Sequence, residues 1–304
     1  MQKVVRIAKS SCFKKKYMLK ALLRVLAMMP LPIINAVGVL TGWGLYFFSH
    51  KVLRRTRKNL SVAGITSSTE EYHRLVRHSI LETGKGLVET FAIWFRPQGK
   101  VLPWVRECHG WEHVEAAQAQ GQGIIFLTPH LGCYEVTALY YAARHPITVL
   151  YRPARQQWLA PLIDEGRNRS QIKQAPTSLS GVRSLLKALK QGEAVGILPD
   201  QVPEFGEGTW ADFFGTPAYT MTLVGKLADT SGARVLLAFG ERLPWGRGYI
   251  IHIQPLEMEP TPANINQGIE QLIRQCPAQY LWSYRRFKQP KPHGKPRETQ
   301  GGTN

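Results

Sequence analysis

The chain is poor in acidic residues. It has 21 Asp and Glu residues against 39 Lys and Arg residues, which gives a formal net charge of +18 at pH 7. Such an imbalance indicates an anionic partner, and the candidates are nucleic acid, an anionic membrane surface and a phosphorylated substrate.

Cysteine is also scarce, and its spacing excludes a disulfide framework. The four cysteines are far apart and form no CxxC pair: Cys12, Cys108, Cys133 and Cys276. This pattern is typical of reduced thiols in a cytosol-facing protein. Cys108, His109 and His113 could begin a metal site, but the sequence offers no second ligand cluster with matching spacing. A surface helix that starts at Gly110 is the simpler interpretation, so we expect neither a metal nor another cofactor.

Several motifs of common enzymes are missing. There is no GxxxxGK[ST], which argues against a nucleotide P-loop, and no GxSxG, which argues against a serine nucleophile elbow. No aromatic RNA-binding motif accompanies the basic residues, so we expect no nucleic-acid partner. The sequence shows no internal repeat.

One histidine and one carboxylate stand where catalytic groups often lie. An apolar run, Ile124–Leu127, stops at a Thr-Pro pair, His130 follows, and Glu135 comes five residues later on a segment that can form a helix. Two side chains five apart on one helix diverge by about 140°. The pair can therefore meet only if His130 sits in the turn before the helix, and Pro129 and Gly132 favour such a turn. The arrangement indicates a general base and its orienter, and the alternative is a structural histidine.

The N-terminal region is basic and then apolar. Lysines and arginines precede a charge-free run over residues 25–49, and more follow it at residues 51–58. The run is long enough to span a bilayer, and it lacks the cleavage site of a removed signal. Because Pro30 and Pro32 interrupt a single straight helix, we expect a kinked or re-entrant element, or a short span that starts near Ile33. The basic flanks suit anionic lipid headgroups. A buried hairpin of a soluble protein is the alternative.

The rest of the chain alternates strand and helix patterns. Residues 59–98 read as helical, and amphipathic helices are expected around residues 136–144, 182–192, 220–228 and 265–276. Five strands are expected between them: Ile124–Leu127, Ile147–Tyr151, Ala194–Leu198, Arg234–Phe239 and Tyr249–Gln254. We therefore predict an α/β protein with an N-terminal hydrophobic membrane helix, a helical segment, and a mixed, mostly parallel sheet flanked by helices. The predicted boundaries are a membrane anchor at 1–60, the α/β domain at 61–287, and a disordered basic tail at 288–304.

Three polar residues follow predicted strands. His130, Arg152 and Asp200 each stand at a carboxyl end, where ligands of such sheets gather. Gln201 comes next, and it begins a long loop over residues 202–215 of the kind used as a lid or binding loop.

Further cations cluster nearby in the sequence. Arg167 and Arg169 form one group, and residues 285–288 form another. Fixed cations that face one site suit phosphate groups or a developing oxyanion, although each arginine could equally be a solvated surface charge.

Taken in order, these segments resemble the bacterial lipid A biosynthesis acyltransferases. The resemblance rests on the basic and apolar N-terminus and on a series of motifs: Arg57–Leu60, Thr128–Glu135, Tyr151–Pro153, Gly166–Arg169, Gly196–Gln201, Phe213–Ala218 and Gln279–Tyr284. The sequence of residues 205–212 departs from the one more common in the family.

The resemblance implies a function and a site. It places the catalytic dyad on His130 and Glu135, and a supporting arginine on Arg167 or Arg169. It implies transfer of a fatty acyl chain from acyl carrier protein to a hydroxyl of a lipid A precursor, an anionic glycolipid, at the bacterial inner membrane with the catalytic domain facing the cytoplasm. Substrate contacts are expected from Arg152, Arg167, Arg169, Asp200 and Gln201.

The expected mechanism is direct acyl transfer. His130 removes the hydroxyl proton, Glu135 holds the other ring nitrogen, and the hydroxyl attacks the thioester. Two alternatives stay open at this point. One is the same chemistry on a lysophospholipid or another membrane glycolipid, and the other is a non-catalytic basic protein that binds membranes or nucleic acid.

Overall fold

A seven-stranded mixed sheet forms the centre of the protein. The computed structural model describes residues 21, 23–152, 166 and 169–290. Within this part of the chain the sheet order is β1-β9-β8-β2-β5-β3-β4, and every neighbouring pair is parallel except β8 and β9. The strands are β1 (Val105–His109), β2 (Ile124–Leu127), β3 (Ile147–Tyr151), β4 (Ile172–Pro176), β5 (Ala194–Ile197), β8 (Arg234–Arg242) and β9 (Tyr249–Pro255).

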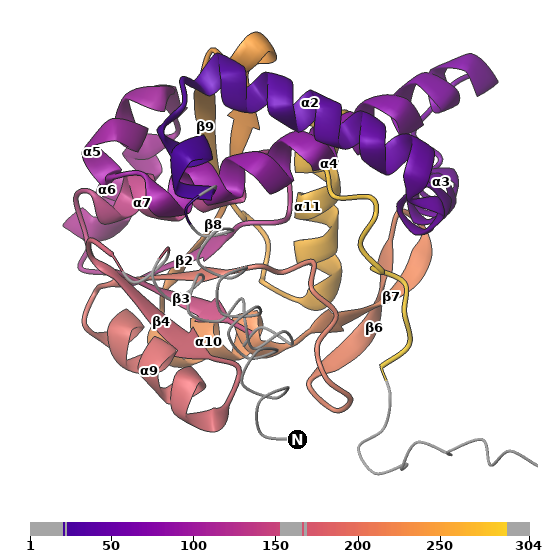
Figure 1. The fold of residues 1–304 in the computed structure, drawn as a ribbon. Coiled ribbons are helices and arrows are strands. Elements are labelled where there is room, and N and C mark those ends of the chain that lie inside the picture. The colour runs from indigo at the N-terminus through magenta and orange to yellow at the C-terminus, as the bar shows by residue number, and fades with distance from the viewer. Residues whose placement is uncertain (1–20, 22, 153–165, 167–168, 291–304) are drawn as a thin grey trace, which may run out of the picture.

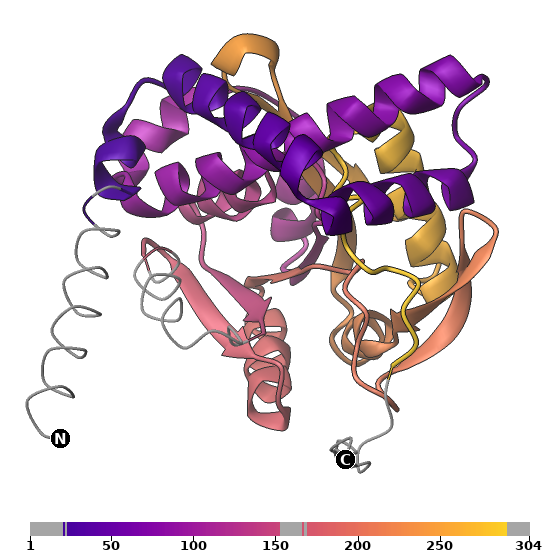
Figure 2. The ribbon, with the colours of Figure 1, turned by 45° about the vertical axis from the view of Figure 1, so that its right-hand side comes forward.

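Helices cover both faces of the sheet (Figures 1 and 2). One face packs on α9 (Leu179–Lys190), α10 (Leu223–Ser231) and α11 (Pro262–Gln275). The other face packs on α6 (Trp111–Ala119), α7 (Tyr134–Ala142) and the C-terminal half of α4 (Thr69–Phe95). The short elements α5 (Gln98–Val101), η1 (Leu102–Trp104), η2 (Pro244–Gly246) and η3 (Pro277–Gln279) complete the chain order.

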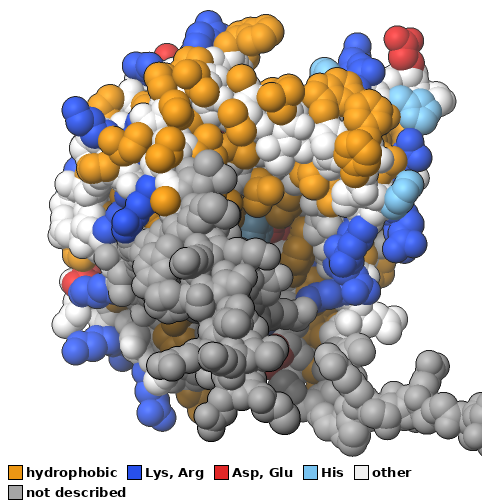
Figure 3. Space-filling view, viewed as in Figure 1, with side chains coloured by type: hydrophobic (Ala, Val, Ile, Leu, Met, Phe, Trp, Pro, Cys, Tyr) orange, Lys and Arg blue, Asp and Glu red, His pale blue; other side chains and the backbone are white. Residues whose placement is uncertain are grey.

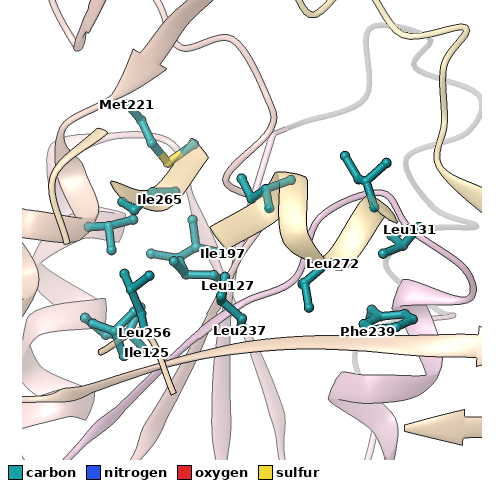
Figure 4. Packing of buried hydrophobic residues seen from close by; sticks show 14 of the residues in the cluster. Ile125, Leu127, Leu131, Ile197, Met221, Leu237, Phe239, Leu256, Ile265 and Leu272 are labelled. Carbon is teal, nitrogen blue, oxygen red and sulfur yellow. The ribbon is translucent and has the colours of Figure 1, made fainter. Parts of the chain in front are cut away.

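Side-chain alternation on the central strands makes two cores. Ile125 and Leu127 of β2 point to the α11 side with Leu237 of β8 and Leu272, as Figure 4 shows, whereas Ile124 and Phe126 point to the α7 side. Since successive residues of a strand face opposite ways, a strand that is apolar at every position belongs in the middle of a sheet covered on both faces.

The predicted fold class is confirmed, with differences at several elements. Residues 59–98 do not form one helix: α3 (His50–Ala63) ends at Gly64, whose φ is 57°, and α4 begins after the cap Ser68, whose hydroxyl accepts from the Glu71 amide. A left-handed glycine and a serine cap are typical signals for a helix end and a helix start. The helix predicted at residue 220 begins at Leu223, because the preceding residues belong to a strand.

The loop expected over residues 202–215 is largely a β-hairpin. Strands β6 (Gly208–Phe213) and β7 (Thr216–Met221) pair antiparallel around Phe214 and Gly215, whose φ angles are 51° and 67°. Positive φ at both central residues is the geometry that two-residue hairpin turns favour. Strands β1 and β4 were also absent from the prediction.

The apolar N-terminal run forms α2 (Leu31–Phe48), which Pro30 separates from the helical residues before it. Among the residues that the structure describes, α2 is the one helix long and apolar enough to cross a membrane. It lies along α4 (Figure 1), and its buried stripe contains Leu31, Ile34, Gly38 and Gly42. The predicted tail falls outside the described residues from residue 291 onwards.

Candidate active site

His130 lies in the turn between β2 and α7. The helix begins only at Tyr134, so His130 stands before it, as the sequence spacing required. Gly132 has φ 58°, and a Cβ built there would lie 2.0 Å from the Gly240 carbonyl oxygen, so glycine alone fits this turn.

Backbone hydrogen bonds from three separate segments fix this turn. The Thr128 amide donates to Ile197 O at 2.9 Å, which continues the β2–β5 ladder. The Cys133 amide donates to Gly240 O at 2.7 Å, and the Leu281 amide donates to His130 O at 2.9 Å. The histidine backbone is therefore tied to the sheet on one side and to residues 279–281 on the other.

Gln279 joins the last two of these segments. Its amide side chain bonds Arg242 twice, accepting from the backbone N at 2.8 Å and donating to the backbone O at 2.9 Å. Its own carbonyl accepts from the Gly132 amide at 3.1 Å. Gln279 thus extends the end of β8 as a strand partner would, and it holds the histidine turn at the same time.

The carboxylate on the imidazole is that of Asp200. His130 Nδ1 lies 2.9 Å from Asp200 Oδ1, and the His130 amide donates to Oδ2 at 3.0 Å. Asp200 follows β5, which is the strand beside β2 in the sheet. The sequence predicted this hydrogen bond for Glu135 and a substrate contact for Asp200. In the structure the end of β5 places Asp200 at the ring, and both of its oxygens bond His130.

The electrostatics of Asp200 favour the charged form. Complete burial acts to raise the pKa of Asp200, but the charge and two hydrogen bonds of His130, together with Arg286, hold that pKa below its ordinary value. A charged carboxylate on Nδ1 keeps the proton at that nitrogen and leaves the lone pair on Nε2, which has no hydrogen-bond partner among the described residues.

Two tyrosines flank the imidazole. The Tyr134 ring meets it edge-on at 4.9 Å between centroids, and the Tyr284 ring lies parallel to it at 6.0 Å. Tyr284 is fixed in turn, because its hydroxyl accepts from the Val202 amide at 3.0 Å. Sequence reasoning missed both rings as parts of the site, although Tyr134 stands inside the histidine motif.

An apolar pocket opens beside this group on the α7 side of the sheet. Most of its lining is apolar, with Phe126, Val149, Ala238 and Ile251 from the strands. The polar side chains in the lining include Thr128, Glu135, Thr137, Arg169 and Gln174, and Tyr134 adds a ring. A narrow space with apolar walls and a few polar groups suits a hydrocarbon chain with a polar end.

Glu135 lies on the first turn of α7, where a carboxylate favours the positive end of the helix dipole. It shares the pocket lining with Arg169, whose guanidinium donates to the carbonyls of Arg96 and Ile93 at the end of α4. Burial lowers the pKa of Arg169, and the charge of Glu135 acts in the opposite direction. Arg169 therefore braces the last turn of α4 as well as lining the pocket.

A second pocket lies on the opposite face of the sheet. Arg152 and Gln201 line it together with Lys226 and the hydroxyls of Thr177, Ser178 and Thr222, and Glu207 adds one carboxylate. Leu198, which follows β5, borders both pockets. The predicted substrate contacts thus fall into three places. Arg152 and Gln201 line this second pocket, Arg169 lines the apolar pocket, and Asp200 bonds His130.

Two of the predicted cation groups differ from expectation. Arg167 lies outside the described residues. Arg286 is buried and donates to Tyr219 O, the Thr220 hydroxyl and Asn266 Oδ1, so it joins β7 to α11. It forms no hydrogen bond to a site residue in the part of the chain that the structure describes, and its charge reaches the site only through its effect on the pKa values of Asp200 and Tyr284.

In the part of the chain that the structure describes, no three metal-ligating side chains come together. His109 instead bonds Glu107 at 2.9 Å and stacks on His252, while Gly110 is followed by α6 as the simpler interpretation predicted.

The fold and this constellation define a class: an α/β protein with a carboxylate-bonded histidine at the strand ends, next to a mainly apolar pocket. A sequence model described as "Bacterial lipid A biosynthesis acyltransferase" matches residues 7–289. The chain therefore belongs to the bacterial lipid A biosynthesis acyltransferase family.

Individual relatives agree with this assignment. The lipid A biosynthesis lauroyltransferase of Escherichia coli (strain K12) is 30% identical over 276 residues, covering 88% of this chain and 89% of the relative. The palmitoleoyltransferase of the same strain is 31% identical over 270 residues, covering 86% of each chain. The myristoyltransferase of that strain is 23% identical over 252 residues, covering 79% of this chain and 76% of the relative. These findings support acyl transfer onto lipid A.

Proposed function

We propose that the protein moves a fatty acyl chain from an acyl-carrier-protein thioester to a hydroxyl of a lipid A precursor, with His130 as the general base. The observation that carries this mechanism is the Asp200–His130 pair, which leaves Nε2 as a proton acceptor beside an apolar pocket. Nε2 takes the proton of the acceptor hydroxyl, and the oxygen attacks the thioester carbon. The carbon–sulfur bond then breaks, and the leaving sulfur takes the proton from the imidazolium to form the thiol.

Asp200 and Glu135 have different parts in this proposal. Asp200 fixes the tautomer of His130 and stabilises the imidazolium that forms. Glu135, at the polar end of the apolar pocket, accepts a hydrogen bond from the acceptor hydroxyl and orients it toward Nε2. Glu135 thus stays a catalytic residue, but it acts on the substrate and not on the imidazole.

The two pockets suit the two parts of the reactants. The acyl chain enters the apolar pocket between the sheet and α7. A phosphate group, carried by the glycolipid acceptor or by the prosthetic arm of the carrier protein, meets Arg152, Lys226 and Gln201 in the second pocket. We further propose that the protein works at the bacterial inner membrane from the cytoplasmic side, where an acidic carrier protein and an anionic membrane both complement its net charge of +18.

The test is a turnover assay on purified protein in detergent. Acyl-carrier-protein and coenzyme A donors are offered with a lipid A precursor or a lysophospholipid, and mass spectrometry identifies the product. We expect transfer from acyl-carrier protein to the lipid A precursor, and at least about a hundredfold loss in His130→Ala, the low end of a general-base contribution.

Substitution of Glu135 tests its proposed contact with the acceptor hydroxyl. Glu135→Gln should lower kcat and raise KM for the acceptor without moving the pH dependence of the rate. Near-normal turnover by folded His130→Ala would overturn the mechanism, and transfer to the lysophospholipid alone would overturn the acceptor.

A further inference from the structure

Large apolar side chains are concentrated on one side of the molecule. Nine of the thirteen exposed large apolar residues in the described part of the chain form what we call the apolar face: Val25, Met28, Met29, Ile33, Leu40, Phe47, Phe48, Leu87 and Trp245. Leu40 is 70% exposed and Phe48 is 86% exposed. Figure 3 shows hydrophobic side chains, in orange, as a band across the part of the surface that α2 and its neighbours form. A contiguous patch of this kind marks an interaction surface.

The apolar face belongs to one stripe of α2 and to the elements beside it. Ile33, Leu40 and Phe47 recur every seven residues and therefore share one side of the helix. Gly38 and Gly42 each lie two positions from Leu40, about 200° around the axis, so they point to the other side. Leu87 comes from α4, and Trp245 comes from η2, which contacts the start of α2.

Glycines hold α2 firmly against α4. A Cβ at Gly38 would lie 2.6 Å from the Lys85 Cα, and one at Gly84 would lie 2.3 Å from the Gly42 amide nitrogen. The two backbones are thus in direct contact, and no side chain separates them. An α2 that left α4 to cross a bilayer would expose this glycine seam and the buried residues Ile34 and Ile80.

The helix cannot span a membrane while it remains in this position. Its partner α4 carries Glu82, Lys85 and Glu89 along the same stretch, and Arg242 of β8 joins the two glutamates. A spanning α2 would carry these charges, and with them the edge of the sheet, into the hydrocarbon core, where charged side chains are strongly unfavourable.

Positive charge borders the apolar face. The basic residues of α3 and of the first turns of α4 that are exposed are Lys51, Arg54, Arg57, Lys58, Arg74 and Arg77. The acidic residues beside them are Glu70 and Glu71 at the start of α4. An apolar centre with a mainly basic border complements an anionic lipid surface, which takes the apolar groups among its acyl chains and the cations among its headgroups.

We infer that α2 lies in the plane of an anionic lipid surface and docks the folded domain through the apolar face, without crossing the bilayer. This inference rests on the proposed membrane function and specifies how the membrane is met. It also places the rest of the domain, including the sheet, on the water side of α2.

Depth measurement distinguishes the orientations. A nitroxide amino acid is placed at Ile33, Leu40 or Phe47 of the full chain, and collisions with oxygen and with a water-soluble nickel complex are measured on vesicles of phosphatidylethanolamine and phosphatidylglycerol. An in-plane helix puts all three labels at one shallow depth. A spanning helix puts Leu40 near the bilayer centre and the other two near opposite surfaces, which would overturn the inference. A label at Leu179, an 80% exposed leucine on α9, should stay in water.

Substitution gives a second readout. Leu40→Asp should weaken binding to these vesicles at least about tenfold, whereas Leu179→Asp, the same change at a distant exposed leucine, should leave it unchanged. Circular dichroism confirms that both variants fold. Equal losses of vesicle binding in both variants, or no loss in either, would overturn the inference. In the depth experiment, nitroxide labels that are shielded from both quenchers without vesicles would also overturn it, since a second copy of the chain would then cover the apolar face.

Vesicle binding and acyl transfer are read separately. Protein that transfers acyl chains in detergent but shows no vesicle binding would refute the in-plane docking alone. Protein that docks as inferred but transfers nothing would refute the proposed reaction alone.

Discussion

At the residue scale, the site depends on which carboxylate bonds the imidazole of His130. Asp200 is fully buried and holds His130 through both oxygens, whereas Glu135 faces the apolar pocket. The sequence placed both carboxylates near the histidine, but distance along the chain favoured Glu135. Pairing of β2 with β5 is a long-range property, and it is what brings Asp200, seventy residues away, to Nδ1.

Asp200→Asn should reduce kcat by at least about a hundredfold, because an amide neither holds the productive tautomer securely nor stabilises the imidazolium. Steady-state rates measure this loss. A near-normal kcat in folded Asp200→Asn would show that Asp200 does not act on His130.

The lowered pKa of Asp200 also predicts a pH dependence of stability. A carboxyl group whose pKa is lower in the folded state stabilises the protein above its unfolded pKa of about 3.9, and this contribution is lost as pH falls through the folded pKa. The free energy of unfolding of the wild type relative to Asp200→Asn should therefore be constant above about pH 4 and should decrease as pH falls below it. Urea titrations at several pH values measure this difference; a constant difference throughout would contradict the assignment.

At the element scale, the close packing of α2 on α4 depends on glycine. A Cβ at Gly42 would lie 2.6 Å from the Leu81 Cα and 3.0 Å from the Leu81 carbonyl oxygen, whereas one at Gly44 would meet nothing within 4 Å. The two positions share a helix and differ in what faces them, so they form a matched pair.

Gly42→Ala should destabilise the protein by about 1–3 kcal/mol, because the new methyl group forces two backbones apart. Gly44→Ala should instead stabilise it by up to about 1 kcal/mol through helix propensity. Thermal unfolding of the two variants in the same detergent provides the comparison. Equal melting temperatures would mean that α2 does not stay on α4 in solution.

Element prediction succeeded where the signal was local. Apolar runs gave β2 and β3 with their bounds, and periodicity gave α9 and α11. Strand β4 was missed because Lys173 and Gln174 dilute its pattern at the edge of the sheet, and the β6–β7 hairpin was hidden by Phe214, which is an unusual residue for a positive φ. The sequence predicted that His130, Arg152 and Asp200 lie at strand ends. It did not predict that Asp200 bonds His130, because that contact depends on β5 lying beside β2 in the sheet.

At the scale of the whole molecule, the N-terminal helices are part of the packed structure. Ile34 and Leu60 are buried in the same two cores that contain the sheet strands. The region expected to act as a membrane anchor therefore also covers apolar surface of α4 within the described structure.

Deletion of residues 1–58 should collapse the protein and not simply release it from membranes. The deletion removes α2 and most of α3, which uncovers the backbone of α4 at Gly84 and takes Ile34, 1% exposed in the full chain, out of the core. We expect aggregation, or loss of a cooperative thermal transition, in detergent as well as without it. A soluble and active truncation would show instead that α4 is stable on its own.

The contacts of His130 also set the order in which the enzyme can become active during its synthesis. The Leu281 amide and the Tyr284 ring complete the surroundings of a histidine made about 150 residues earlier. A ribosome that has finished the sheet as far as β9 has therefore still not made a working site. The surroundings of His130 are complete only after residue 284 has left the exit tunnel.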